Sequence, residues 1–304
     1  MKPKHAIIAV AVLLAAALAA WAYYPPFRLF AIYAAGRSPS CPLNQAVECA
    51  SHIQALEAAK DRIIAGSRRI QSDPAGFDLY STPVGNWWIP AGDRFMLPFN
   101  LAEQELDIYG TSGVQPVRPG DVVLDCGANI GVFTRKVLDR GAGKVIAIEP
   151  APENLECFRR NFKKEIAAGK VVVYPTGVWD KDDVLEMNID PTNTAADSFV
   201  IHREGSHKLR LPLTTIDKLV AELALPRVDY IKMDIEGAEP NALMGARETL
   251  AKWKPRMSLA AYHQQDHPVR IPAIVLGIRN DYGVECGPCE EHGNRIVPDV
   301  LYFR

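Results

Sequence analysis

The chain has no excess of basic residues. Its 34 lysines and arginines are balanced by 36 aspartates and glutamates, which gives a formal charge of −2. Nucleic-acid binding relies on clustered cations that neutralise phosphates, so we expect no DNA or RNA partner. The sequence also lacks internal repeats and long low-complexity tracts. Its 304 residues, 48% of them hydrophobic, suffice for one sizeable domain and an appendage.

Cysteine is scarce, with six residues in the chain. Cys41 and Cys49 lie near each other in the N-terminal part and could form a disulfide outside the cytosol. In the cytosol they would be two thiols, and we expect the reduced form. Cys126 and Cys157 are expected to be small buried side chains.

The C-terminal part has one close cysteine pair and no second pair nearby. Cys286, Cys289 and His292 are residue types that bind zinc. A structural zinc site needs four ligands, however, and His263 or His267 would have to complete it. We therefore expect this segment to be a loop that leads into a final strand.

The Gly-x-Gly-x-x-Gly pattern of dinucleotide sites is missing from the most informative segment, Val122–Pro150. This segment, VVLDCGANIGVFTRKVLDRGAGKVIAIEP, combines an apolar strand, a turn with Gly127 and Gly131, a helix and a second apolar strand. The glycines permit positive φ and a close approach of a ligand to the backbone. The second strand ends at Glu149, where a nucleotide-binding βαβ unit places its ribose-binding acid.

The same turn distinguishes between nucleotides. Asp125 ends the first strand, and its carboxylate would repel a pyrophosphate. S-adenosylmethionine has no phosphate, and its ammonium and sulfonium suit a neighbouring acid. We therefore expect S-adenosylmethionine, held by Asp125, Gly127, Asn129, Gly131 and Glu149. A dinucleotide site and a turn without a cofactor are the alternatives.

Two further strand ends predict the reacting groups. Asp234 follows the strand Val228–Met233, and His263 comes shortly after Met257–Ala261. Ligands of open α/β sheets bind beyond the carboxyl ends of the strands, so both side chains should face one crevice. Methyl transfer to a hydroxyl requires alignment of the acceptor and removal of its proton. His263 is the candidate base, and Asp234 either holds the imidazole or takes the proton itself.

A metal-assisted arrangement is the alternative for the same residues. Asp234, Glu236 and His263 could hold a divalent ion such as Mg²⁺. Such an ion would lower the pKa of the acceptor hydroxyl as a Lewis acid.

Three motifs carry a family resemblance. DCGANIGVFT followed by IEPAPENLECFRRN resembles the first two motifs of class I S-adenosylmethionine-dependent methyltransferases. The run LPLTTIDKLVAELALPRVDYIKMDIEGAEPNALMGARETLAKWKP, residues 211–255, resembles the FkbM family. The resemblance covers about residues 103–262. It implies a Rossmann-like α/β fold with a seven-stranded, mostly parallel sheet and an antiparallel edge strand.

The resemblance also implies an activity. It suggests O-methylation of a sugar or another small hydroxyl-bearing metabolite, with a non-catalytic cofactor-binding or scaffold protein as the alternative. The family often has an acid before its first core strand, a position that Glu105 matches. Glu105 is therefore either a second cofactor contact or a surface acid. Val178 lies where this fold usually brackets the adenine, and the neighbouring Trp179 could wall the same purine face.

Two β-rich segments accompany the motifs. Residues 76–109 contain Gly85–Asn86, a common hairpin turn, and could cover the cofactor pocket. Residues 184–213 are expected to form a hairpin whose polar tip, 190–197, either lines the substrate entrance or is solvated.

The N-terminus carries the longest apolar run, Ala6–Tyr24. About 20 apolar residues span a bilayer, and aromatic residues mark its interface. We expect residues 1–27 to be an uncleaved single-pass anchor, 28–75 a helical linker and 76–304 the methyltransferase domain. A cleaved signal peptide and a secreted domain are the rival interpretation. The catalytic domain is expected on the cytoplasmic face, where S-adenosylmethionine is made. The acceptor and the oligomeric state stay open.

Overall fold

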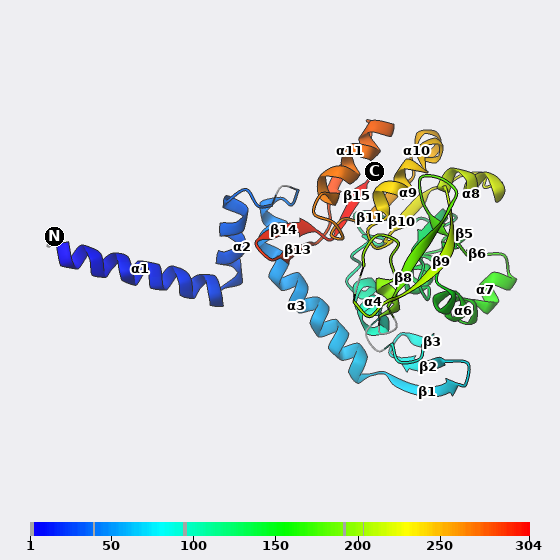
Figure 1. The fold of residues 1–304 in the computed structure, drawn as a ribbon, viewed down its shortest axis with the longest axis horizontal. Coiled ribbons are helices and arrows are strands. Elements are labelled where there is room, and N and C mark those ends of the chain that lie inside the picture. The colour runs from blue at the N-terminus through cyan, green and yellow to red at the C-terminus, as the bar shows by residue number, and fades with distance from the viewer. Residues whose placement is uncertain (1–2, 39, 94–95, 191–192, 203) are drawn as a thin grey trace.

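A seven-stranded, mostly parallel sheet forms the centre of the molecule (Figure 1). The computed structural model describes residues 3–38, 40–93, 96–190, 193–202 and 204–304. The sheet contains, in spatial order, β12 (Val284–Cys286), β15 (Val300–Phe303), β11 (Arg256–Ala260), β10 (Tyr230–Met233), β4 (Val122–Cys126), β5 (Lys144–Ile148) and β6 (Val171–Tyr174).

One strand of this sheet runs against the others. β15 pairs antiparallel with β11 on one side and with β12 on the other. The expected antiparallel final strand is therefore confirmed, but its expected place at the edge is wrong. Because β12 covers it, β15 is second from the edge.

Both faces of the sheet are buried. Val123 of β4 packs into one core and the next residue, Leu124, into the other, because successive strand side chains point to opposite faces. One core includes residues of α5 (Val132–Asp139) and α6 (Pro152–Asn161), beyond which α7 (Lys163–Ala167) follows. The other core is covered by α8 (Ile216–Glu222), α9 (Glu239–Met244), α10 (Arg247–Trp253) and α11 (His267–Ile278).

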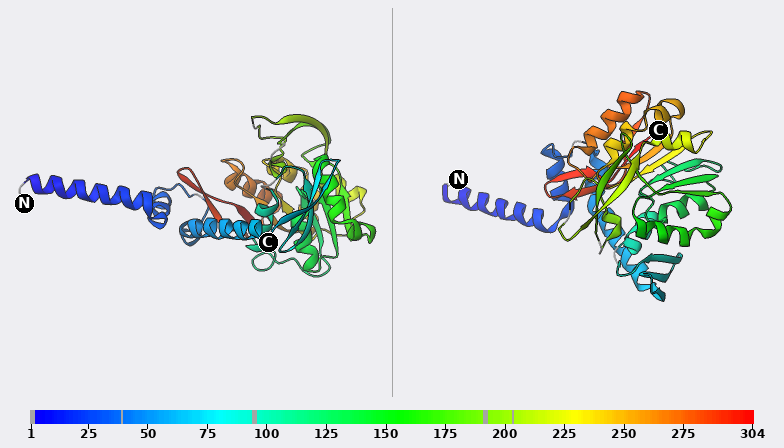
Figure 2. Two further views of the ribbon diagram at one scale, coloured as in Figure 1. Left: turned by 90° about the horizontal axis from the view of Figure 1, so that it is seen from below. Right: turned by 45° about the vertical axis from the view of Figure 1, so that its right-hand side comes forward.

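The N-terminal helices lie outside this sandwich. α1 (Pro3–Tyr23) projects away from the body, α2 (Pro25–Ala34) turns back, and α3 (Leu43–Ala65) runs along its side (Figures 1 and 2). Among the residues described, no single helix has the length and hydropathy of a membrane span; α1 from Val10 and α2 together pass that test across a bend of 104°. The expected single-pass helix is therefore not supported.

A disulfide joins the N-terminal helical part of the chain to its C-terminal part. Cys41 is bonded to Cys289, at the start of the hairpin formed by β13 (Cys289–His292) and β14 (Arg295–Pro298). This pairing corrects the expected reduced state of Cys41 and makes Cys289 unavailable to the alternative zinc site. The expected loop is instead partly the strand β13. Cys49 keeps a free, buried thiol. An ion pair between Arg28 and Glu291, 2.7 Å apart, supports the same contact.

A small sheet of β1 (Arg68–Asp73), β2 (Phe77–Thr82) and β3 (Gly85–Pro90) lies beyond the end of α3 (Figure 1). Its β2–β3 turn contains Pro83 and Val84, so the expected Gly85–Asn86 turn is wrong by two residues. The sheet packs on α6, where the Trp88 N–H donates to Asn161 at 2.8 Å. None of its strands lines the pocket at Glu149 described below. The later part of the expected segment does approach the β4–α5 turn, because Asn100 and Tyr109 line a small pocket with Gly127 and Asn129.

Two more segments shape the site. A second three-stranded sheet contains β7 (Gly177–Val178), β8 (Asp183–Ile189) and β9 (His207–Thr214), and the expected hairpin is its β8–β9 pair. Between β8 and β9, a 3₁₀ turn at Thr194–Ala196 reaches back over the large sheet. α4 (Met96–Glu105) lies beside that turn. Asp93 accepts hydrogen bonds from the Thr194 N–H and hydroxyl, both at 2.9 Å, and anchors it there.

Candidate active site

A pocket opens at the carboxyl ends of β4, β5 and β10, where ligands bind in open α/β sheets. It reaches from the β4–α5 turn to the 3₁₀ turn. Its lining residues include Gly127, Asn129, Ile148, Glu149, Val178, Thr194, Asp197, Phe199 and Asp234. Of the predicted cofactor contacts, Gly127, Asn129, Glu149 and Val178 therefore meet in one place.

The two glycines of the turn are needed for protein packing. Gly127 has φ +77°, and a Cβ there would lie 1.9 Å from the backbone oxygen of Asp234. Gly131 has φ +98°, and a Cβ there would lie 2.1 Å from the ring of Phe162. Gly127 still lines the pocket, but Gly131 does not. The expected approach of a ligand at Gly131 is thus replaced by a close approach of α6.

Glu149 is fixed by backbone donors. Its Oε2 accepts the Asn129 N–H and its Oε1 accepts the Ala151 N–H, both at 2.9 Å. Burial raises its pKa, although the hydrogen bonds oppose this. A carboxylate oxygen can accept more than one hydrogen bond, so both oxygens keep capacity for a hydroxyl. This geometry suits a ribose.

Asp125 lies beneath the turn. Its side chain is fully buried, accepts a hydrogen bond from the Thr134 hydroxyl at 2.6 Å, and lies 3.7 Å from the Lys232 ammonium. It does not line the pocket. Lys232 also donates to the Gly127 carbonyl oxygen at 2.8 Å. Asp125 and Lys232 thus form a buried ion pair that supports the turn, which corrects the expected contact between Asp125 and the cofactor.

The far end of the pocket is apolar apart from one acid. Val178 and Phe199 line it, whereas Trp179 does not. Asp197 also lines it, and burial, with the nearby charges of Glu149 and Glu153, raises the pKa of Asp197 to about 8. The sequence indicates only a polar tip at Asp197, because burial by residues distant in the sequence has no local signal.

Asp234 connects this pocket to a second, larger cavity. It lines both, and its Oδ2 accepts a hydrogen bond from the Tyr109 hydroxyl at 2.6 Å. Burial would raise the pKa of Asp234, but Lys232, His263 and the Tyr109 hydrogen bond lower it below its ordinary value. Asp234 is therefore a carboxylate at neutral pH, and its side chain is 20% exposed.

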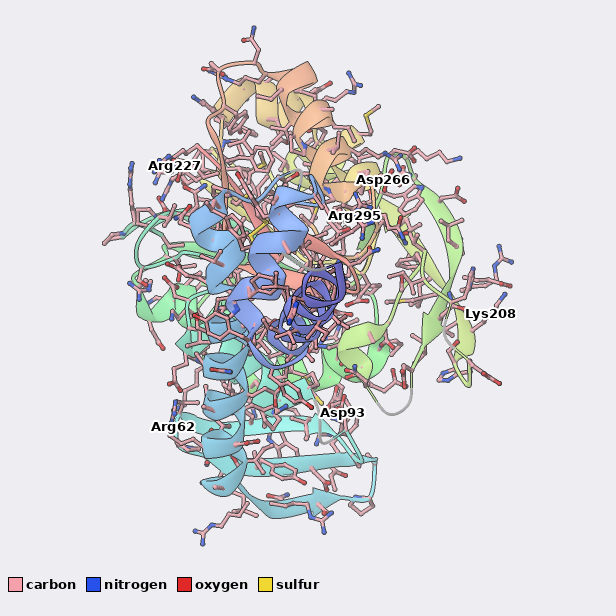
Figure 3. The ribbon with its side chains drawn as sticks, turned by 90° about the vertical axis from the view of Figure 1, so that its left-hand side faces the viewer. Arg62, Asp93, Lys208, Arg227, Asp266 and Arg295 are labelled. Carbon is pink, nitrogen blue, oxygen red and sulfur yellow. A yellow bond between two sulfur atoms is a disulfide. The ribbon has the colours of Figure 1, made fainter. Side chains whose placement is uncertain are left out.

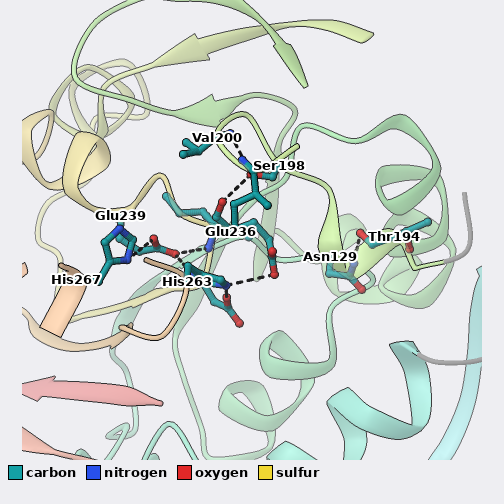
Figure 4. Close-up of polar contacts among 12 residues, drawn as sticks. Asn129, Thr194, Ser198, Val200, Glu236, Glu239, His263 and His267 are labelled. Carbon is teal, nitrogen blue, oxygen red and sulfur yellow. Dashed lines mark hydrogen bonds and ion pairs between the residues drawn. The ribbon is translucent and has the colours of Figure 1, made fainter. Parts of the chain in front are cut away.

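His263 is surrounded by carboxylates (Figure 4). Its Nε2 lies 3.2 Å from Glu236 Oε1 and 3.5 Å from Asp234 Oδ1. Its Nδ1 lies 3.0 Å from Glu239 Oε1. Burial would lower the pKa of His263, but the charge of Glu239 and the contact with Glu236 raise it well above its usual value. The predicted meeting of Asp234, Glu236 and His263 is present in the structure.

Glu239 and His267 were not predicted as site residues. Glu239 begins α9, and its Oε1 accepts the Ile235 N–H at 2.9 Å. The fully buried Glu239 also faces two histidines, and its Oε2 lies 3.5 Å from His267 Nδ1. No local pattern could indicate this, because three separate elements meet there.

The second cavity has a volume of about 660 Å³, within the range of small-molecule sites. Its walls are formed by α3, α4, the connection between β8 and β9, the residues after β10 and β11, and the end of β13. Its lining residues are Glu57, Lys60, Met96, Phe99, Asn100, Glu103, Asn193, Ala195, Ala196, Ile201, Asp234, Glu236, Tyr262, His263 and His292. The polar tip between β8 and β9 thus lines a cavity, as one of the two interpretations expected.

Glu105 lies outside this site. It is ion-paired with Arg62 of α3, which is labelled in Figure 3, and its side chain is 46% exposed. The expected cofactor contact is therefore not formed. Glu103 of the same helix faces the cavity instead, and burial together with Asp299 and Asp234 raises the pKa of Glu103 well above its usual value.

Two overlapping groups of side chains could hold a cation. Asp234, Glu236 and His263 form one, and Glu239, His263 and His267 form the other. Within each group, one ligand atom per residue lies within 4.8 Å of the others. Both groups use His263, the first on its Nε2 side and the second on its Nδ1 side.

Comparison with known proteins now decides the family. The Methyltransferase FkbM domain matches residues 125–285, which is more than half of the chain. The chain belongs to the FkbM methyltransferase family. The fold agrees, since the large sheet has the mostly parallel α/β architecture of class I methyltransferases. Membership of this family implies S-adenosylmethionine as the methyl donor.

The FkbM relatives are distant. A 31-O-demethyl-FK506 methyltransferase FkbM from Streptomyces tacrolimicus is 26% identical over 52% of this chain and 71% of its own length. A hexuronic acid methyltransferase AglP from Haloferax volcanii is 28% identical over 43% of this chain and 52% of its own length. The crystal structure of methyltransferase FkbM from Methylobacillus flagellatus KT has 20% identity and a TM-score of 0.49, over 84% of this chain and 59% of that chain.

Proposed function

We propose that this FkbM methyltransferase transfers a methyl group from S-adenosylmethionine to a hydroxyl of a sugar or another small metabolite. The observation that supports this most directly is the position of Asp234. This carboxylate lies where the pocket at Glu149 meets the larger cavity. A donor bound at Glu149 and an acceptor bound in the cavity would meet there, as transfer requires.

The walls of the cavity support a hydroxylated acceptor. Asn100, Asn193 and Lys60 offer hydrogen-bonding groups, and Phe99 and Tyr262 offer aromatic faces. Polar groups fix the orientation of a ligand, and apolar surface supplies most of its burial. The names of two relatives agree with this class, because one is a hexuronic acid methyltransferase and the other acts on 31-O-demethyl-FK506.

We assign proton removal to Asp234. The bound sulfonium supplies an activated methyl group. As the acceptor oxygen bonds to that methyl carbon and the C–S bond breaks, the hydroxyl proton becomes strongly acidic, and a carboxylate can accept it. His263 Nε2 lies 3.2 Å from Glu236 Oε1 and 3.5 Å from Asp234 Oδ1, so a proton on Nε2 faces both carboxylates. His263 therefore orients Asp234 and Glu236 as a donor, which revises its expected role as the base.

Magnesium at Asp234, Glu236 and His263 is the metal-assisted version of this mechanism. The three ligand atoms are close enough for one cation. Two carboxylates suit Mg²⁺, but the imidazole suits it less, since Mg²⁺ prefers oxygen ligands. Activity that persists after exhaustive chelation would exclude this version.

We propose that α1 holds the enzyme at a membrane. Its aliphatic side chains are exposed, with Leu13 at 68% and Leu18 at 70%, and the helix projects away from the body. We place the catalytic domain on the cytoplasmic face because the methyl donor is made there. The Cys41–Cys289 disulfide argues for an oxidising compartment instead. Protease protection in intact cells decides between the two.

Titration calorimetry of S-adenosylmethionine into the full-length protein tests the proposed function. We expect binding that is lost in Glu149→Ala and retained in Glu105→Ala, a matched glutamate outside the site. Methyl transfer from labelled donor to a panel of hydroxylated glycans should fail in Asp234→Asn. Donor binding without transfer to any acceptor would favour the scaffold alternative, and no binding to the folded wild type would refute the proposal.

A further inference from the structure

Glu239, His263 and His267 form a buried cluster behind the reacting groups (Figure 4). Glu239 begins α9, His263 follows β11, and His267 begins α11. Their side chains are 0%, 2% and 1% exposed. The side chains of the cluster are therefore buried and come from three separate elements, and His263 connects them to the second cavity.

Each member of the cluster has a buried polar atom without a hydrogen-bond partner. These atoms are Glu239 Oε2, His263 Nδ1 and His267 Nδ1. Buried polar atoms are normally satisfied, and three orphans that converge need an explanation. A buried carboxylate in addition costs several kcal/mol unless a positive charge compensates it.

The three residues offer one ligand atom each within 4.8 Å of one another, as a metal site requires. His263 Nδ1 lies 3.0 Å from Glu239 Oε1, and His267 Nδ1 lies 3.5 Å from Glu239 Oε2. Zinc bonds of 2.0–2.1 Å in tetrahedral geometry place neighbouring ligand atoms about 3.4 Å apart. The second contact is too long for a good hydrogen bond, and the first is not aligned as one.

We propose that Glu239, His263 and His267 bind a zinc ion. Two imidazoles and one carboxylate, with a water in the fourth position, are a common zinc ligand set, whereas Mg²⁺ and Ca²⁺ prefer oxygen ligands. The Nε2 side of His263 fits this assignment as well. Histidines that bind a metal usually donate their other ring N–H to a carboxylate, and His263 Nε2 faces Glu236 and Asp234.

The zinc ion would fix the geometry of the proposed active site from behind. It would join the starts of α9 and α11 to the end of β11 and hold the His263 ring with its Nε2–H toward Asp234. The three residues thereby act as a positioning group. This inference does not depend on methyl transfer, because zinc content is measured without donor or acceptor.

The test is the metal content of the untagged full-length protein, grown with added zinc, passed over a chelating resin and analysed by mass spectrometry. We expect about one zinc per chain in the wild type and at least about tenfold less in Glu239→Gln and His267→Ala. His207→Ala, which removes an exposed histidine of β9, is the matched control and should keep its zinc. Far-UV circular dichroism shows whether each variant is folded.

A second measurement covers variants that fail to fold. His267→Cys keeps a zinc ligand and should retain the metal, and Co²⁺ substituted into the wild type should give the visible absorption of a four-coordinate site. A wild type that binds no zinc, that binds magnesium instead, or that keeps the same zinc in all folded variants would overturn the proposal. Donor binding, measured separately, reports on the proposed function alone.

Discussion

The buried pair of Lys232 and Asp125 makes a quantitative prediction. The two side chains are 6% and 0% exposed, and their charged atoms lie 3.7 Å apart. Lys232→Met would leave the Asp125 carboxylate buried without its cation. Breaking such a pair costs about 3–5 kcal/mol, because the remaining charge stays desolvated. We therefore expect the free energy of unfolding to fall by about that amount.

A double-mutant cycle separates the ion pair from its surroundings. Asp125→Asn should also destabilise the fold, because it leaves the Lys232 ammonium buried. The double variant should lose less free energy of unfolding than the two single variants lose together. The difference, which is the coupling energy, should be about 1–3 kcal/mol. Urea unfolding, followed by tryptophan fluorescence, measures the free energy of unfolding of the wild type, the two single variants and the double variant.

The same cycle tests whether Asp125 contacts the cofactor. In the structure it supports the turn, so folded Asp125→Asn should bind S-adenosylmethionine within about threefold of the wild type. A direct charged hydrogen bond would instead be worth about 1.5–3 kcal/mol, or more than tenfold in affinity. A large loss of affinity together with additive stabilities would refute the structural role.

Three further predictions concern other parts of the molecule. Glu149→Gln keeps the shape of the side chain but removes its charge, so the affinity for S-adenosylmethionine should fall about 10- to 100-fold by calorimetry; an unchanged affinity would contradict the ribose assignment. The raised pKa of Asp197, about 8 against about 3.9 when unfolded, means that the native state binds an extra proton between these values. Its contribution to the free energy of unfolding should therefore decrease as the pH rises through that window, on the order of a few kcal/mol, and Asp197→Asn should flatten the pH dependence measured by urea unfolding. The Cys41–Cys289 disulfide predicts four reactive thiols in the denatured, unreduced protein and six after reduction; Cys41→Ser should lower the free energy of unfolding by about 2–5 kcal/mol, and six thiols without reductant would show that the bond is absent.

The sequence predicted those parts of the fold that depend on short stretches of neighbouring residues. The apolar strands that lead into Asp125, Glu149 and Asp234 predicted the parallel sheet, because only a doubly covered sheet buries such runs. The meeting of Asp234 with His263 follows from the parallel pairing of β10 with β11, since each residue comes after one of these strands. The family motifs lie in the same stretch, so fold and family came from the same residues.

The misassignments share a physical reason. Asp125 was predicted as a ligand contact because it is an acid at the end of a strand. In the fold it forms an ion pair with Lys232 of the neighbouring strand instead. Glu105 and Glu103 are two positions apart on one helix, and only packing against α3 shows which of them faces the cavity. The partner of Cys41 is 248 positions away, a separation at which the sequence contains no pairing signal.

The parts of the chain outside the family match also shape the second cavity, where we propose that the acceptor binds. α3 contributes Glu57 and Lys60 to its wall, and the β13–β14 hairpin contributes His292. The disulfide and the Arg28–Glu291 ion pair hold these two segments together. Because both lie outside residues 125–285, relatives can share the donor motifs and still differ in the acceptor wall. We therefore expect exchanges in α3 to alter acceptor preference while donor affinity stays constant, and a donor affinity that changes in parallel would show that the two pockets are not separable.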